Sequence, residues 1–188
     1  MTARPDDLSF RPATTDDVDA VVAVVEAAYR GEPTHAAWTT EAHLLGGQRV
    51  DATMVTDAVL GPDTEVVVAT DPSDGEVVAC CEVARPDDRG HSVLGMFAVD
   101  PRRQAAGLGR RVLAAGERLA ADLGATAVEL HVFEVRTELI DWYRRRGYRT
   151  TGERVPFPYG DERFGLPRRD DLWFSVLVKA VSAEAQEG

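Results

Sequence analysis

Two glycines placed just ahead of a helical repeat are the residues in this 188-residue sequence whose spacing most suggests chemistry. Gly107 and Gly109 follow the apolar, β-branched run His91–Val99 and precede residues 112–119, where apolar side chains recur at helical spacing. The first turn of a helix leaves backbone N–H groups unpaired at the positive end of the macrodipole, and this end attracts phosphate. Glycine has no Cβ that would keep a ligand away from the main chain. The stretch therefore predicts a strand, a turn and a helix that together bind a phosphate group.

Two common phosphate-binding patterns are excluded by single residues. A Walker loop needs Lys and then Ser or Thr after its last glycine, but Arg110 and Arg111 follow Gly109. A dinucleotide fingerprint needs a third small residue where Val112 stands. What remains is Val99-x-Pro101-x-x-Gln104-x-x-Gly107-x-Gly109. This pattern resembles the acetyl-CoA signature of the GNAT superfamily of N-acetyltransferases.

The resemblance implies an α/β (α+β) GNAT-like fold: a mixed, mostly antiparallel sheet of about seven strands, helices on both faces, and splayed fourth and fifth strands. Alternating apolar residues predict strands at 8–10, 65–70, 77–83, 91–99, 126–133, 148–155 and 171–181, with a long loop at 156–170. Helical spacing and caps predict helices at 14–30, 51–59, 108–123 and 136–146, and a short one ending at Leu45 after a cap at Thr39 or Thr40. The strand–helix–strand order from Val93 to Val132 implies one parallel pair. Residues 1–188 are expected to form a single domain with its core at about 8–181 and a frayed tail at 182–188.

In GNAT proteins the pantetheine arm of acetyl-CoA lies between the splayed strands. The resemblance therefore implies that main-chain groups of Phe97, Ala98 and Val99 bond this arm, and that one N–H polarises the thioester carbonyl. The turn that follows is expected to hold the pyrophosphate through Gln104, Ala105, Ala106, Gly107, Leu108, Gly109 and Arg110. Arg102, Arg103 and Arg111 are in range for further phosphate contacts.

A second family pattern, Tyr-x-x-x-Gly-Phe/Tyr, matches residues 143–148. The resemblance implies that Tyr143 is the general acid, because a tyrosine with an ordinary pKa of about 10 is protonated at neutral pH and can donate to the departing CoA thiolate. An aromatic packing role is the alternative. The family often has Asn seven residues before this tyrosine, and Arg136 stands there instead, which suggests a contact with a CoA phosphate.

The general base is less well marked by the sequence. A primary amine has a pKa of about 10 and must lose a proton before it attacks a carbonyl carbon. Many family members carry an acid on the fourth strand near the place that Leu94 takes here. His131 and Glu82 are our leading candidates for the base, and structural roles remain open for both. His91, Glu129 and Glu134 lie on or beside the same expected strands.

The acceptor is expected to bind between the first helix and the second strand, which in GNAT proteins helps to wall the acceptor pocket. Trp38, Glu41 and Arg49 are the candidates there, with packing or surface roles as the alternative. The net charge is −11, and the excess of acidic residues falls in residues 1–94. Such acidity disfavours nucleic-acid binding and favours a small cationic amine as the acceptor.

Composition and residue spacing also bear on localisation, disulfides, metal binding and oligomeric state. No apolar run is long enough to span a membrane and the N-terminal residues lack a signal-peptide core, so a cytoplasmic protein without membrane contact is expected. Cys80 and Cys81 are adjacent on an expected strand and point to opposite faces, which makes a disulfide between them unfavourable. No ligand spacing suggests a metal site. An exposed edge strand could pair two copies into a homodimer.

Together these features predict an acetyl-CoA-dependent N-acetyltransferase that joins donor and small amine in a ternary complex, with direct attack of the amine. Two alternatives stay open from the sequence. The chain could bind acyl-CoA without catalysis, as a sensor, or it could acetylate a protein N-terminus or a lysine side chain.

Overall fold

The structure of the chain is a computed structural model that describes residues 8–31 and 40–182, without the side chains of residues 104–106. Its strands are β1 (Ser9–Pro12), β2 (Leu45–Gly46), β3 (Thr64–Thr70), β4 (Val77–Ala84), β5 (His91–Val99), β6 (Ala127–Phe133), β7 (Arg149–Pro156), β8 (Leu166–Pro167) and β9 (Trp173–Ala180). Its helices are α1 (Val18–Arg30), α2 (Ala52–Leu60), α3 (Leu108–Asp122) and α4 (Thr137–Arg144), and short 3-10 turns cover Thr15–Asp17, Pro101–Ala106 and Glu162–Phe164. None of the helices in this part of the chain combines the length and the apolar character that crossing a bilayer would require.

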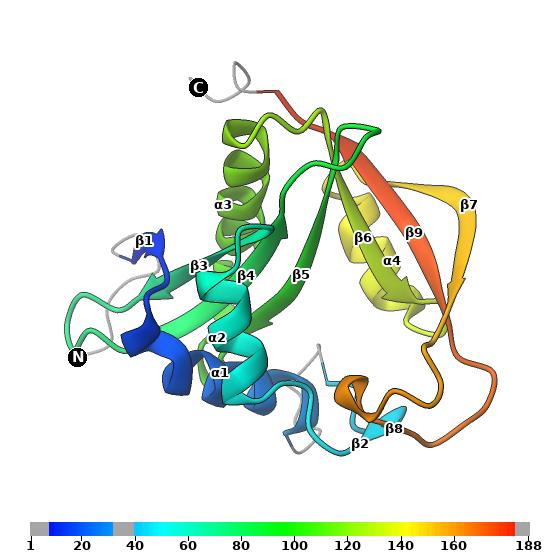
Figure 1. Cartoon of the computed structure of the whole chain (residues 1–188), viewed down its shortest axis with the longest axis horizontal. Helices are drawn as coiled ribbons and strands as arrows, with labels where there is room; N and C mark the ends of the chain where they lie inside the picture. Colours follow the sequence, from blue (N-terminus) through cyan, green and yellow to red (C-terminus); the bar gives the residue numbers. More distant parts are fainter. Residues whose placement is uncertain (1–7, 32–39, 183–188) are drawn as a thin grey trace.

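Seven strands form one sheet in the order β1-β3-β4-β5-β6-β9-β7 (Figure 1). All neighbours are antiparallel except β5 and β6, which are joined through α3 and run parallel. A parallel pair needs such a crossover, because its two strands start at the same edge of the sheet. The predicted fold class, with its one parallel pair, is therefore confirmed.

The two parallel strands separate after three residues. His91, Ser92 and Val93 pair with Ala127–Glu129, and beyond them β5 and β6 diverge (Figure 1). A β-bulge accompanies the divergence: Glu82 pairs with Gly95 and Cys80 with Ala98, so two residues of β5 oppose one residue of β4. A bulge bends its strand and increases the local twist, which turns β5 away from its parallel neighbour. The predicted splay of these strands is confirmed.

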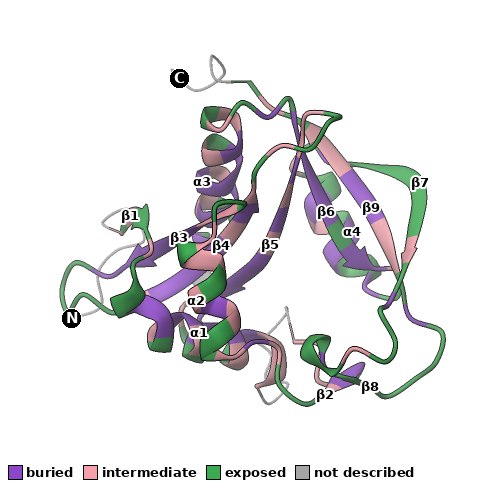
Figure 2. Cartoon of the chain, in the orientation of Figure 1, coloured by how far each residue is buried: buried purple, intermediate pink, exposed green. Residues whose placement is uncertain are grey.

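Helices cover both faces of the sheet, and much of β3, β4 and β5 between them is buried (Figure 2). Two hydrophobic clusters result. On one face α1 and α2 pack against Val66, Val68 and Cys80, whereas on the other face α3 and α4 pack against residues that include Cys81. The adjacent cysteines thus point to opposite faces, as the alternation of a strand predicts. Gly116 lets α3 approach the sheet, because a Cβ there would lie 2.6 Å from a methyl carbon of Leu94.

The predicted short helix ending at Leu45 is wrong. The chain makes a single turn, in which the N–H groups of Leu44 and Leu45 donate to the Glu41 carbonyl, and it then enters β2. β2 pairs with β8, which lies in the loop expected at 156–170. The reason is tertiary: Leu44 and Leu45 bury their side chains in a third cluster with Phe133, Phe157 and Leu172, and an extended chain leads there.

Candidate functional site

The turn between β5 and α3 opens onto unfilled space. Gly107 caps α3 with a φ of +74°, the left-handed conformation that glycine adopts without strain. Apart from its chain neighbours, no heavy atom of the described residues lies within 4 Å of the position that a Cβ on Gly107 would take. Leu108 is buried and Gly109 lies in the first turn of this 15-residue helix. The turn therefore fits the predicted phosphate site, where main-chain N–H groups would do the binding. The side chains of Gln104, Ala105 and Ala106 lie outside the described residues.

Three of the four arginines around this turn have structural partners. Arg102 forms an ion pair with Asp100, with 2.7 Å between Nη2 and Oδ2. Arg103 places Nη1 2.7 Å from Oδ2 of the buried Asp71. Arg111 lies over an aromatic ring of β1 at 5.3 Å from the ring centroid. The ion pairs occupy Arg102 and Arg103, and Nη1 of Arg111 is buried without a hydrogen-bond partner among the described residues. Arg110, which is exposed, is therefore the first candidate for an anion.

Arg110 is exposed and approaches a second basic residue that the sequence analysis missed. The guanidinium of Arg146 lies 3.4 Å from the centroid of the Trp142 ring, and its Nε is buried without a hydrogen-bond partner among the described residues. Burial, together with the charges of Arg145 and Arg110, holds the pKa of Arg146 below its ordinary value. Like charges gathered at the start of α3 and the end of α4 favour an anion between them.

Among the described residues, the edge of β5 that faces β6 has no strand partner from Leu94 onward, because the pairing of these strands ends at Val93. On its other edge β5 pairs with β4, through Ala98 opposite Cys80 and Val99 opposite Ala79. The carbonyl oxygen of Phe97 accepts a hydrogen bond of 2.9 Å from the Tyr29 hydroxyl on α1. The strand thus offers main-chain groups that no neighbouring strand of the described residues pairs, and such groups can bind an extended ligand.

A cavity lies where β5 and β6 diverge, and most of the predicted catalytic and acceptor residues meet there. Tyr143, His131, Glu41 and Phe97 all line it. Glu82 is not among the lining residues, although its carboxylate oxygen Oε2 would lie 3.9 Å from a Cβ placed on Gly95, which does line the cavity. Trp38 lies outside the described residues. The cavity thus unites side chains from α1, α4, both splayed strands and the segment after α1.

Tyr143 approaches this cavity from α4. Its side chain is buried, and its ring lies 6.4 Å from the Phe97 ring and 5.6 Å from the Tyr148 ring, centroid to centroid. Burial raises the pKa of its hydroxyl above the ordinary tyrosine value. The hydroxyl makes no hydrogen bond within the described part of the chain. A neutral hydroxyl with a free proton is thereby held at the cavity wall.

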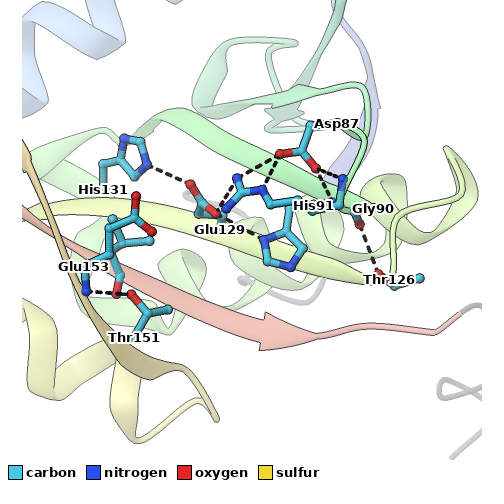
Figure 3. Close-up of polar contacts among 10 residues, drawn as sticks. Asp87, Gly90, His91, Thr126, Glu129, His131, Thr151 and Glu153 are labelled. Atoms are coloured by element: carbon cyan, nitrogen blue, oxygen red, sulfur yellow. Dashed lines mark hydrogen bonds and ion pairs between the residues drawn. The ribbon is translucent and has the colours of Figure 1, made fainter.

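His131 is oriented by a buried carboxylate (Figure 3). Alternation along β6 puts Glu129 and His131 on the same face, and Nε2 of His131 lies 2.9 Å from Oε1 of Glu129. The other oxygen, Oε2, lies 3.2 Å from Nδ1 of His91 and 3.1 Å from Nη2 of Arg89. Burial would raise the pKa of Glu129, but the hydrogen bonds from His131 and His91 outweigh it and hold the pKa below its ordinary value. A charged Glu129 assigns the proton of His131 to Nε2 and leaves Nδ1 as a proton acceptor.

Two further carboxylates lie on the side of the sheet that faces α1. Burial raises the pKa of Glu41 and of Glu82, and the charge of Arg49 opposes the rise in both cases. Oε2 of Glu41 lies 3.8 Å from Nη1 of Arg30. Arg49 itself lines the cavity. The cavity therefore carries charges of both signs.

Arg136 lies at the start of α4 and is buried. Its Nε lies 2.5 Å from Oε1 of Glu138, and its Nη1 donates to the Thr40 carbonyl over 2.9 Å. Arg136 therefore joins α4 to the segment that carries Glu41. A contact between Arg136 and a CoA phosphate stays a prediction.

Aromatic side chains that the sequence analysis missed form one part of the cavity wall. Phe133 and Phe174 stack with 4.3 Å between ring centroids, and Phe157 lies 6.1 Å from Phe133. They come from β6, from β9 and from the loop after β7, and no local pattern links these segments. The sequence signal that could have indicated this wall is the high density of aromatic residues in 157–174.

Comparisons with known proteins find similarity to acetyltransferases. The acetyltransferase (GNAT) family model matches residues 19–148. Among solved structures, nourseothricin acetyltransferase is 20% identical with a TM-score of 0.63, over 93% of this chain and 99% of that chain. The ribosomal-protein-S18-alanine N-acetyltransferase of Escherichia coli is 16% identical with a TM-score of 0.65, over 96% and 98%. The PaiA N-acetyltransferase of Thermoplasma acidophilum, solved with coenzyme A, is 12% identical with a TM-score of 0.61, over 92% and 98%. No curated protein sequence matches.

Proposed function

Because the chain belongs to the GNAT family of acetyltransferases, we propose that it moves the acetyl group of acetyl-CoA onto a primary amine by direct attack. The observation that carries this proposal is the cavity at the divergence of β5 and β6, lined by both Tyr143 and His131. We call the β5 edge, the 101–107 turn and the start of α3 the donor half. The acceptor half comprises Glu41, Arg49, His131 and the aromatic wall of Phe133, Phe157 and Phe174.

The donor half suits acetyl-CoA through main-chain groups. Bound acetyl-CoA supplies a thioester whose carbonyl carbon accepts the amine nitrogen and whose C–S bond then breaks. N–H groups at the start of α3 would bind the pyrophosphate, with Arg110 and Arg146 in support. The unpaired edge at Phe97 would bind the pantetheine arm, and an N–H near the bulge would stabilise negative charge on the carbonyl oxygen.

Proton transfer is assigned to the side chains on either side of the cavity. Nδ1 of His131 accepts a proton from the attacking amine, while Glu129 keeps the imidazole in the required tautomer. The Tyr143 hydroxyl donates its proton to the departing sulfur, since its raised pKa keeps it neutral until that step. The proton on His131 leaves to solvent and Tyr143 regains one from solvent. The net reaction moves one proton from nitrogen to sulfur.

Release of free CoA thiol from acetyl-CoA, measured across a panel of small amines, tests this function. Calorimetry on folded protein checks CoA binding in the same preparation. We expect CoA to bind and some amines to increase thiol release. Binding of CoA without release by any amine, lysine peptide or N-terminal peptide would instead indicate a non-catalytic acyl-CoA-binding protein. Release with peptides alone would move the acceptor class to proteins.

Tyr143→Phe tests the role of the acid. The variant removes a hydroxyl and leaves the ring packed against Phe97 and Tyr148. We expect kcat to fall by about 10- to 100-fold while the dissociation constant of CoA changes little. An unchanged kcat with full CoA affinity would remove Tyr143 from the mechanism and leave it a packing residue.

A further inference from the structure

The acceptor half contains a guanidinium group without a counter-charge in contact. Arg49 lines the same cavity as His131 and Tyr143. Within residues 8–31 and 40–182, its side chain makes no hydrogen bond and no ion pair, and its described contact is with the Tyr29 ring, whose centroid lies 5.3 Å from Cζ. A half-buried guanidinium gains from a planar anion that can satisfy two of its N–H groups at once. The cavity wall thus presents a place for an acid group of the ligand.

The position of this guanidinium is well determined by the chain around it. The backbone N–H groups of Arg49 and Val50 both donate to the same carboxylate oxygen of Glu26 on α1, and the bond from Val50 measures 2.9 Å. The aromatic ring of Tyr29 supports one face of the guanidinium, and the Tyr29 hydroxyl is itself tied to β5 through Phe97. A binding group held in this way loses little conformational entropy when a ligand arrives.

The remaining charges of the cavity complement an ammonium group. Glu82 lies beside Gly95, and Glu41 lines the cavity with Nη1 of Arg30 3.8 Å from its Oε2. The charge of Arg49 acts on both carboxylates, but neither is in ion-pair contact with it. Together with Nδ1 of His131, these acids can attract the positive amine. The cavity therefore offers attraction for both charges of a zwitterion, whereas a purely cationic amine would leave Arg49 without an anion in contact.

The aromatic wall indicates what lies between these charges. Phe133, Phe157 and Phe174 line the cavity together with Leu45, so the part of the ligand that enters there buries an apolar surface. From these contacts we propose that the acceptor is a free α-amino acid with an apolar side chain, whose carboxylate binds Arg49 while its amine faces His131. This inference rests on the proposed acetyl transfer. It also distinguishes the acceptor from a protein N-terminus, whose first residue has no free carboxylate.

The test compares amino acids with their amides. L-phenylalanine, L-leucine, L-methionine and L-tryptophan are each assayed against the corresponding amide, which keeps the size and the amine but removes the negative charge. We expect kcat/KM for at least one acid to exceed that of its amide by about 10- to 100-fold, because the loss of one charged partner leaves the other unpaired. Equal or faster turnover of every amide would overturn the proposal while leaving acetyl transfer to amines in place.

Variants of Arg49 assign the preference to this side chain. Arg49→Gln should bring the ratio of kcat/KM for the acid to kcat/KM for its amide down to about one. Arg49→Lys should keep part of that ratio, because lysine retains the positive charge without the planar fork. Arg85→Gln is the matched control and should keep the full preference, because Arg85 is exposed, directly follows β4, pairs with Glu65 and does not line the cavity. Thermal unfolding of each variant verifies folding. An acid preference that survives in both Arg49 variants would overturn the assignment.

Calorimetry separates failure of this inference from failure of the proposed function. The amino acids are titrated into protein saturated with CoA, in wild type and in Arg49→Gln. Binding of an acid that weakens about 10-fold or more in the variant supports the carboxylate site even if no thiol is released. If amines that lack a carboxylate release thiol but none of the amino acids binds, acetyl transfer stands and the proposed carboxylate site is wrong.

Discussion

The donor half and the acceptor half of the cavity draw on the chain in different ways. The donor half is continuous in sequence, since β5, the turn with Gly107 and the start of α3 follow one another. The acceptor half takes Glu41 and Arg49 from the segment between α1 and α2, His131 from β6 and Phe157 from the loop after β7. A ligand bound by main-chain groups needs one correctly folded segment, whereas a ligand bound by side chains needs several segments to meet. Variants in each half should therefore affect different kinetic constants.

The largest effect is expected from the proposed base. His131→Gln removes the proton acceptor and should lower kcat by about 100-fold or more, with the dissociation constant of CoA unchanged. His91→Gln is the matched control, because His91 also bonds Glu129 but does not line the cavity. Stopped assays with saturating acetyl-CoA measure both. Equal losses of kcat in the two variants would show that the hydrogen bonds of Glu129 with His131 and His91 matter for stability and not for catalysis.

The next effect concerns the donor half. Gly107→Ala puts a Cβ on a residue with a φ of +74°, which costs roughly 1–2 kcal/mol for an L-residue and disturbs the first turn of α3. We expect KM for acetyl-CoA to rise about 10-fold and KM for the amine to stay within 2-fold. Gly124→Ala has a similar φ of +91° at the far end of α3 and open space around its Cβ, so it reproduces the strain without touching the site. A rise in donor KM in both variants would contradict the local assignment.

A smaller effect is expected at Arg146, the arginine that approaches Arg110 beside the start of α3. Arg146→Gln should raise KM for acetyl-CoA by about 3-fold at low salt, and less at high salt because the interaction is screened. Acetyl-CoA titrations at several salt concentrations measure it. Arg144→Gln is the control, since Arg144 pairs with Asp141 on an exposed face of α4. If the salt dependence of donor KM is the same in Arg146→Gln as in wild type, this guanidinium does not meet a phosphate.

The smallest effect lies outside both halves. The hydrogen bond from Arg11, chiefly, lowers the pKa of Asp17 from 3.8 to about 2. Because the folded-state pKa is the lower one, this interaction stabilises the protein fully above about pH 4 and is lost as the pH falls towards 2. The pair is partly exposed, so Asp17→Asn should cost only about 1 kcal/mol of unfolding free energy at pH 6. Denaturant unfolding should show this difference shrinking between pH 4 and 2, with both KM values unchanged. A difference that does not shrink between pH 4 and 2 would contradict this assignment.

Most of the fold could be predicted from local sequence, because each signal acts within one element. The alternating residues of β3 and β4 and the cap at Asp51, whose side chain accepts from the Met54 N–H, have direct structural counterparts. The chain around Leu45 could not be predicted in this way, and the short helix expected there is a turn followed by β2. Its capping and apolar residues also suit a turn followed by a strand, and the packing of Leu45 against residues more than a hundred positions away decides between them.

The sequence by itself determined the elements of the donor half, because the strand, the glycine turn and the helix start follow one another and each has a local sequence signal. Tertiary structure decided the acceptor half. His131 and Glu82 were equal candidates for a base in the sequence, and the divergence of β5 and β6 puts His131 at the cavity wall with its tautomer set by Glu129. Arg49 was one of three acceptor candidates in the sequence, and its position in the cavity, without an ion pair to a described residue, is what sets it apart. The residue type fixes the charge and the hydrogen-bonding capacity of a side chain. Which groups are paired depends on distances between segments, and the spacing of residues along the sequence does not give these distances.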